Sequence, residues 1–369
     1  MKDKLFKVID NLKSQMINDV CDLVKIDSVG TVATPDAPFG KGPLSALNHA
    51  LKMCEREGLK IKSVDNYMGY GQWGDGDDYI AIMGHLDVVE VGDGWNHPPF
   101  SAYIEDNKIW GRGALDNKGP LIAAFYGLLA LKECNIKLKH PIRIIFGTNE
   151  ETGMEDCHYY LSKEKAPIAG FTPDNKFPAI YGERGRAMIR VSGHKKELID
   201  FVNEYLMNAK PNGDRLGINV KDEHFGEMII RNKLFENLEH DYLAVKFSLS
   251  YPNCNIDEII DKIRNKATNL KVELISNSPC VLHNPTSTLI QTLNDAYNEA
   301  NNDNKKPTTT TGGTYARVCH TIVPYGPSFP GQIGIAHQPN EWIDIDDLIK
   351  CAKIYAYALY KLNQIDEFK

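Results

Sequence analysis

Five short segments combine carboxylates or imidazoles with glycine or with the predicted ends of strands. They are Gly84–Val89 (GHLDVV), Gly111–Pro120 (GRGALDNKGP), Gly147–Gly153 (GTNEETG), Phe171–Asp174 (FTPD) and Ala336–Glu341 (AHQPNE). Histidine and carboxylate ligands without cysteine are typical of a catalytic Zn²⁺ or Mn²⁺ site, because structural zinc sites usually recruit thiolates and leave no open position. The eight cysteines are scattered and form no Cys-x-x-Cys pair, which predicts reduced core thiols. The pattern favours a hydrolytic metal site.

Two apolar runs that end in polar residues predict the strands that position these groups. Residues 79–89 and 142–151 have this form, and residues 119–134 between them carry apolar side chains at helical spacing. A strand, a helix and a strand in this order indicate a βαβ unit in a mostly parallel sheet. Ligands of such sheets gather beyond the carboxyl ends of the strands. There the sequence places His85, Asp87, Glu150 and Glu151.

Beyond residue 183 the pattern changes to that of a smaller α+β domain, and from about residue 284 it again resembles the first part. Predicted strands lie at residues 187–191, 227–231 and 243–251, and predicted helices at 197–207, 256–267, 287–301 and 345–362. The sequence thus predicts an α/β fold in which residues 1–183 and 284–369 form a mostly parallel-sheet domain. Residues 184–283 form an inserted, smaller α+β domain.

Composition and charge exclude several classes of protein. The 369 residues include 42 Lys and Arg against 49 Asp and Glu, a net charge of −7, with no basic block. This balance argues against binding to nucleic acid or to an anionic membrane. The longest apolar run, residues 120–131, is too short to cross a bilayer, and residues 1–25 read as an amphipathic helix rather than a signal peptide. We expect a cytoplasmic protein with small or peptide-sized partners.

Six motifs in this order resemble one known family. GHLDVV, GRGALDNKGP, GTNEETG, FTPD, GGTYAR (Gly312–Arg317) and AHQPNE are similar to motifs of the dinuclear-zinc amidohydrolases, which include aminoacylases, succinyl-diaminopimelate desuccinylases, carnosinases and bacterial PepV-type dipeptidases. The PepV-type branch is the nearest match, on Lys118–Pro120, residues 177–183 (FPAIYGE) and Phe329–Gly331. The resemblance implies a zinc-peptidase catalytic domain with an inserted lid domain.

The resemblance also implies a ligand set for two Zn²⁺ ions, with Mn²⁺ or Co²⁺ as possible substitutes. His85 and Asp174 match the ligands of one metal, and Glu151 and His337 match those of the other. Asp116 matches the carboxylate that bridges both.

Further roles follow from the same resemblance. Asp87 would accept a hydrogen bond from the imidazole nitrogen of His85 that does not face the metal. Glu150 would be the general base that takes a proton from the attacking water and passes it to the leaving amine. Adjacent residues on extended backbone point to opposite sides, so the Glu150–Glu151 pair requires an irregular strand end, which Gly153 permits. Substrate contacts through backbone amides are implied for Gly312, Gly313 and Thr314.

The chain departs from the family pattern at several positions. Asn117 stands where relatives usually have a second aspartate linked through a cis peptide, and Asn149 stands where an acidic residue is common. In the insert, His194 could substitute for the substrate-binding histidine of relatives, but its neighbouring lysines favour a solvated role. Ser250 occupies the position of their arginine. The insert is also roughly half as long as is usual in the PepV-type branch.

Three functions therefore remain open. The leading hypothesis is a metallopeptidase that hydrolyses dipeptides or other short peptides. The second is a deacylase of N-acyl amino acids, because the same metal pair attacks any amide. The third is a catalytically silent metal-binding or peptide-binding protein, suggested by the absent lid histidine and arginine. Monomer and homodimer are both compatible with the sequence.

Overall fold

The computed structural model describes residues 1–332 and 334–368, and the chain divides into two compact units. The larger unit comprises Met1–Tyr181, Asn284–Thr308 and Thr314–Lys369, and the smaller comprises Gly182–His283 and Thr309–Gly313. Two of the points at which the chain passes between the units lie within the strands β9 (Ile180–Glu183) and β17 (Thr308–Thr310). Unlike the predicted boundaries, this division assigns residues 182–183 and 309–313 to the smaller unit.

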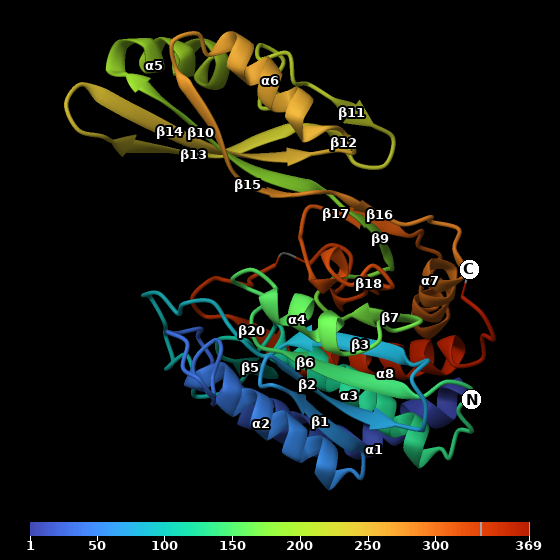
Figure 1. The fold of residues 1–369 in the computed structure, drawn as a ribbon. Coiled ribbons are helices and arrows are strands. Elements are labelled where there is room, and N and C mark those ends of the chain that lie inside the picture. The colour runs from blue at the N-terminus through green and yellow to red at the C-terminus, as the bar shows by residue number, and fades with distance from the viewer. Residues whose placement is uncertain (333, 369) are drawn as a thin grey trace. The chain divides into compact units, whose positions relative to one another are not determined.

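A six-stranded sheet forms the centre of the larger unit, in the order β1-β2-β6-β3-β7-β18 (Figure 1). Its strands are β1 (Lys60–Val64), β2 (Met68–Trp73), β3 (Ile80–His85), β6 (Ile142–Gly147), β7 (Ala169–Thr172) and β18 (Ile322–Pro324). β3 pairs in parallel with β6 and β7, and β7 with β18, whereas β1 and β2 pair antiparallel at one side. The predicted α/β class is confirmed, with a parallel core in a mixed sheet.

The central strand β3 is apolar because both of its faces are covered. Ile80 and Ile82 belong to the main hydrophobic core of this unit, whereas Ala81 and Met83 belong to a second core that includes Cys157 and Tyr315. The strand carries no polar side chain before its carboxyl end, where His85 follows Gly84. A buried strand therefore delivers a histidine to the edge of the sheet.

Helices and short strands complete the larger unit. The helices are α1 (Lys2–Val24), α2 (Lys41–Arg56), α3 (Lys118–Glu133), α4 (Glu155–Lys163), α7 (Thr288–Asn301) and α8 (Ile345–Leu362). The short strands are β4 (Tyr103–Glu105), β5 (Lys108–Trp110), β8 (Asn175–Lys176), β19 (Pro327–Ser328) and β20 (Trp342–Asp344), and a 3₁₀ turn spans Tyr315–Arg317. Within the described ranges, no helix combines the length and the apolar character needed to span a bilayer.

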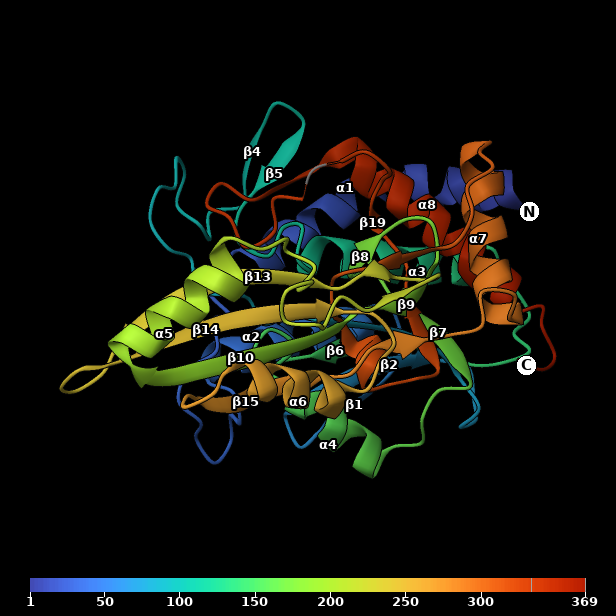
Figure 2. The ribbon, with the colours of Figure 1, turned by 90° about the horizontal axis from the view of Figure 1, so that it is seen from above.

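The smaller unit is a four-stranded antiparallel sheet in the order β13-β14-β10-β15, with two helices on one face (Figures 1 and 2). Its elements are β10 (Gly185–His194), α5 (Lys195–Val202), a π-helical turn (Asn203–Met207), β11 (Lys221–Asp222), β12 (Gly226–Glu227), β13 (Ile229–Asn237), β14 (Tyr242–Tyr251), α6 (Ile256–Lys266), β15 (Lys271–Ser278) and β16 (Val281–Leu282). Alternate residues such as Ile189 and Phe247 pack against α5 and α6. The predicted helix over residues 197–207 is α-helical only to Val202, and β15, whose residues are mostly exposed, was not predicted.

Candidate metal centre

Five residues from separate segments of the larger unit converge at the carboxyl end of its parallel strands. His85 ends β3, Asp116 lies in the turn before α3, Glu151 lies in the turn after β6, Asp174 follows β7, and His337 lies in the loop before β20. They form two groups in which all ligand atoms lie within 4.8 Å of one another. In residues 1–332 and 334–368, these are the two places where three such ligands meet.

The first group contains His85, Asp116 and Asp174. The Nε2 atom of His85 lies 3.1 Å from Oδ1 of Asp116 and 3.6 Å from Oδ2 of Asp174. His85 has no exposed surface. Its other ring nitrogen, Nδ1, lies 2.9 Å from the main-chain oxygen of Asp87, which fixes the ring and directs Nε2 to the carboxylates.

The second group contains Asp116, Glu151 and His337. The Nε2 atom of His337 lies 3.0 Å from Oε1 of Glu151 and 3.1 Å from Oδ2 of Asp116. The two oxygens of Asp116 thus face different imidazoles, Oδ1 toward His85 and Oδ2 toward His337. This is the arrangement in which one carboxylate can bridge two cations.

The charges of the cluster suit cations. A hydrogen bond with Asp116, followed by one with Glu151, raises the pKa of His337 to about 10. Burial alone would lower the pKa of His85, but its carboxylate neighbours outweigh burial and raise it. Burial, and next the charge of Asp116, raises the pKa of Asp174. Each of these shifts favours the protonated form of its group, and a cation held by neutral imidazoles and ionised carboxylates would take the place of those protons.

Glu150 is buried beside the cluster and leaves one oxygen without a partner. Its residue surface is 8% exposed, and Oε1 has no hydrogen-bond partner within the described part of the chain. Burial is the main cause that raises the pKa of this carboxyl well above its ordinary value. A buried polar atom without a partner is unusual in folded proteins and fits a group that meets a ligand or a water. As predicted, the Glu150–Glu151 pair lies on a turn beyond the strand, and Gly153 has a φ of +142°.

The carboxylate of Asp87 holds the turn that carries this pair. Its Oδ1 accepts the N–H of Glu150 and its Oδ2 accepts the N–H of Glu151, each at 3.1 Å. His85 instead makes its close contact with the main-chain oxygen of Asp87, and the carboxylate lies 3.5 Å from Nδ1. The predicted hydrogen bond from His85 to Asp87 therefore goes to the main chain.

A comparison with protein families decides which family this is. The family model described as "Peptidase family M20/M25/M40" matches residues 81–361. The chain belongs to this peptidase family. The match confirms the resemblance drawn from the motifs, and with it the enzyme class, a metallopeptidase of a family with dinuclear metal-binding members.

Members of the M20 family are similar to this chain over almost its whole length. "Putative dipeptidase YtjP" of Bacillus subtilis (strain 168) is 28% identical over 451 aligned positions, which cover 95% of this chain and 97% of that protein. Since 95% of 369 residues is about 350, about 100 aligned positions have no counterpart here. The di-peptidase Dug1p from Saccharomyces cerevisiae has the same fold, with a TM-score of 0.76, 16% identity and coverage of 100% of this chain and 99% of that chain. YXEP of Bacillus subtilis, a dinuclear metal binding peptidase, has a TM-score of 0.67 at 13% identity, covering 96% and 98%.

The two asparagines that depart from the M20 pattern both shape the centre. The peptide bond between Asp116 and Asn117 is cis, and the amide of Asn117 donates to the carbonyl of Pro173, next to Asp174, at 2.6 Å. Asn149 donates to the hydroxyl of Thr152 and accepts the N–H of Glu155. Neither departure removes a ligand atom from the two groups.

The predicted substrate-binding residues are divided between the units. Gly312 and Gly313 belong to the smaller unit, and the N–H of Gly312 bonds to the hydroxyl of Thr310. Thr314 belongs to the larger unit, where its side chain is buried and caps the 3₁₀ turn by accepting the N–H of Ala316. Their contact with substrate stays a prediction.

The substituted positions of the insert lie in the smaller unit. His194 ends β10 on the surface, where its ring lies 4.2 Å from that of Tyr242, in agreement with a solvated position. Ser250 lies in β14 opposite Arg186.

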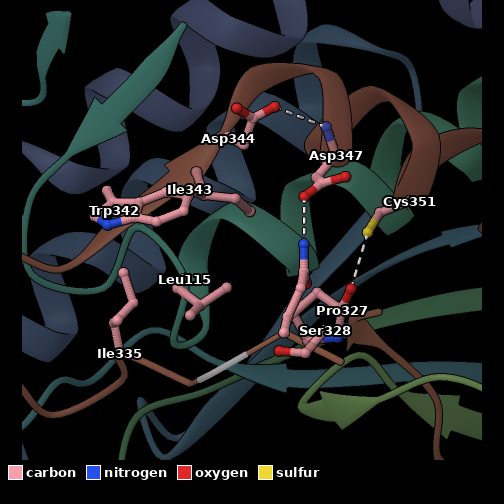
Figure 3. A pocket seen from close by; sticks show the side chains of 10 residues that line it. Leu115, Pro327, Ser328, Ile335, Trp342, Ile343, Asp344, Asp347 and Cys351 are labelled. Carbon is pink, nitrogen blue, oxygen red and sulfur yellow. Dashed lines mark hydrogen bonds between the residues drawn. The ribbon is translucent and has the colours of Figure 1, made fainter. Parts of the chain in front are cut away.

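An apolar cavity of about 360 Å³ lies beside two ligand-bearing segments of the larger unit (Figure 3). Leu115, which precedes Asp116, and Ile335, which precedes His337 by two residues, contribute to its wall. The wall includes two carboxylates: Asp344 caps α8, and Asp347 accepts the amide of Gln332 at 2.6 Å. Both are engaged, so the cavity offers mainly apolar surface.

Three buried polar residues that support the centre had no predicted role. Arg112 and Glu341 form an ion pair between the segments of Asp116 and His337, and Asp156 binds the main chain of Thr148 and Asn149 just before Glu150. Arg112 and Glu341 lie within the GRGALDNKGP and AHQPNE motifs, and this was the available signal. The pattern does not reveal their partners, because Arg112 and Glu341 are separated by 229 positions.

Proposed function

We propose that this chain is a two-metal peptidase that hydrolyses the peptide bond of dipeptides or other short peptides. One observation carries the proposal: the two oxygens of Asp116 face two separate groups of ligands, each completed by one imidazole and one further carboxylate. Two metal ions that share one bridging carboxylate are typical of hydrolytic centres.

The donor set supports Zn²⁺, with Mn²⁺ or Co²⁺ as substitutes. Five protein ligands offer imidazole nitrogen and carboxylate oxygen only, and none is a thiolate. His85 and Asp174 would hold one ion, Glu151 and His337 the other, and Asp116 both. Bound ions of this kind polarise a carbonyl and lower the pKa of water.

Glu150 is the proposed general base. Among the residues that the structure describes, Oε1 finds no hydrogen-bond partner, and it lies in a buried position adjacent in sequence to the ligand Glu151. There the carboxylate would take a proton from the attacking water and deliver it to the nitrogen of the leaving amine. Asp87 supports this step by holding the main-chain N–H groups of Glu150 and Glu151, so that both carboxylates leave the turn in fixed directions.

Dipeptides are the proposed substrates because relatives that are similar over nearly the whole chain carry the name putative dipeptidase. The net charge of −7 without a basic block supports a small or peptide-sized partner rather than nucleic acid. All five ligands come from one chain, so a monomer would carry a complete ligand set, and sedimentation equilibrium would distinguish it from a homodimer.

The test is hydrolysis by the full-length chain after chelator treatment and reloading with Zn²⁺, Mn²⁺ or Co²⁺. A panel of dipeptides and a panel of N-acyl amino acids are assayed on one preparation. We expect turnover of dipeptides with at least one metal and at least tenfold lower kcat/KM for the acyl substrates. Faster turnover of the acyl substrates would make the chain a deacylase, and no turnover with any metal would favour a silent binding protein with an altered insert.

A further inference from the structure

Arg112 and Glu341 form an ion pair that the proposed mechanism does not use. The Nη1 atom of Arg112 lies 2.8 Å from Oε2 of Glu341, and the two side chains are only 2% and 0% exposed. Burying an ion pair is unfavourable unless further hydrogen bonds satisfy it, and apolar side chains of similar volume often stabilise a fold equally well. The pair therefore needs an explanation other than stability.

Glu341 holds the segment that carries the bridging carboxylate. Its Oε1 accepts the N–H groups of Leu115 at 2.9 Å and of Asp116 at 3.0 Å. Its main-chain oxygen accepts the N–H of Gly111 at 2.9 Å. Both ends of the turn that leads to Asp116 are thus bound to one residue.

Arg112 reaches the other segments of the centre. Nη1 also donates to the carbonyl of Gln338, the residue that follows His337, at 3.2 Å. Nη2 donates to the carbonyls of Glu90 and Val91, three and four residues beyond Asp87. The pair therefore binds the main chain of the segments that carry Asp116, His337 and Asp87.

The two imidazoles do not depend equally on such support. His85 is buried at the end of the central strand β3, where the sheet fixes it. The side chain of His337 is 50% exposed and lies in a loop with a φ of +65° at that residue. Outside the ligand contacts, its position depends on main-chain anchors such as the bond from Arg112 to Gln338.

We propose that Arg112 and Glu341 are positioning residues for the second metal position, formed by Asp116, Glu151 and His337. The inference rests on the proposed two-metal function. It predicts that weakening the pair lowers affinity for the second ion selectively, because the first position keeps His85 and Asp174 on the sheet.

The test is Glu341→Gln in the full-length chain. The glutamine can still accept the N–H groups of Leu115 and Asp116 through its carbonyl oxygen, but its amide faces the guanidinium of Arg112. Chelator-treated protein is titrated with Co²⁺, bound ions are counted by elemental analysis, and visible absorption follows each position. We expect one ion to bind as in wild type and the other about 10–100-fold more weakly, the usual effect of losing support around a ligand. The residual spectrum should match that of His337→Ala.

Glu164→Gln is the matched control, since Glu164 forms another largely buried ion pair in the same unit, 3.0 Å from Arg143. Both ions should bind to this control as in wild type. If Glu341→Gln does not fold, Arg112→Lys replaces it, because lysine keeps the buried charge but has no fork to bind Glu341 and the carbonyls of Glu90 and Val91 at once. Unchanged binding in these variants, or equal weakening of both ions, would overturn the inference while leaving the metal centre intact. Fewer than two ions on the wild type would overturn the proposed function itself.

Discussion

The hydroxyl of Tyr315 donates a 2.5 Å hydrogen bond to the buried carboxylate of Asp156. The same carboxylate oxygen accepts the N–H groups of Thr148 and Asn149, which lead directly to Glu150. Gly147 is also required here, because a Cβ at this position would lie 1.8 Å from the Tyr315 hydroxyl. A residue of the GGTYAR motif thus supports the turn of the GTNEETG motif.

Replacing Tyr315 by phenylalanine should therefore destabilise the fold. The variant removes one buried hydrogen bond to a carboxylate, so the free energy of unfolding should fall by about 1.5–3 kcal/mol. Urea unfolding followed by circular dichroism measures the change. Tyr159→Phe is the control, since Tyr159 makes a similar bond to Asp65 on the surface and should lose at most about 0.5 kcal/mol. Equal losses in the two variants would contradict the structural role of Tyr315.

Asp156 should also make stability depend on pH. Burial, and next the charge of Asp87, raises its pKa to about 7 despite its hydrogen-bond donors. The folded state then binds more protons than the unfolded state between the ordinary pKa of aspartate, about 4, and pH 7. Stability is lost as the pH rises through this window, by at most about 1.4 kcal/mol per pH unit from this group. Unfolding of chelator-treated protein at several pH values should show a less negative slope for Asp156→Asn than for wild type, and identical slopes would refute the assignment.

Glu150→Gln separates the proposed base from the ligands. Glutamine keeps the shape of the side chain but cannot accept the proton, so kcat on a dipeptide should fall by about 10²–10⁴-fold. Elemental analysis should still find the wild-type metal content. Glu155→Gln, an exposed position in the same region, should leave both quantities unchanged. Wild-type kcat in Glu150→Gln would exclude it as the base.

Asp87→Asn tests what the Asp87 carboxylate does. An amide can replace only one of the two acceptors that hold the N–H groups of Glu150 and Glu151. The bond from His85 to the main-chain oxygen of Asp87 remains. We therefore expect kcat to fall by about 10–100-fold, with little change in the affinity of the first metal. If the variant binds the first metal more weakly but has the wild-type kcat when both ions are bound, the carboxylate acts through His85 instead.

Much of this architecture could be predicted from the sequence because its signals are local. Ile80 to Met83 form an apolar run that ends at His85, and this pattern identifies a buried strand and the edge where ligands gather. The helix predicted over residues 119–134 is α3, Lys118–Glu133, and the one predicted over 345–362 is α8. Their apolar positions recur at helical spacing, which tertiary contacts then reinforce.

The remaining features depend on contacts between distant segments. Which atom of Asp87 bonds to His85 depends on where the turn of Glu150 lies, 63 positions away. The bonds from Leu115 and Asp116 to Glu341 span more than 220 positions, so neither motif alone reveals them. In the smaller unit, β15 pairs along β10 although most of its residues are exposed, so its hydrophobic pattern gave no signal.

The most direct test of the metal centre is the number of ions bound per chain. Full-length protein purified without chelators, and the variants Asp116→Ala and His337→Ala, are compared by elemental analysis and by Zn²⁺ titration. The geometry predicts two ions for wild type, one for His337→Ala, and loss of tight binding at both positions for Asp116→Ala. Wild-type protein that binds no ion, or an Asp116→Ala variant that still binds two ions tightly, would contradict a carboxylate shared by two metals.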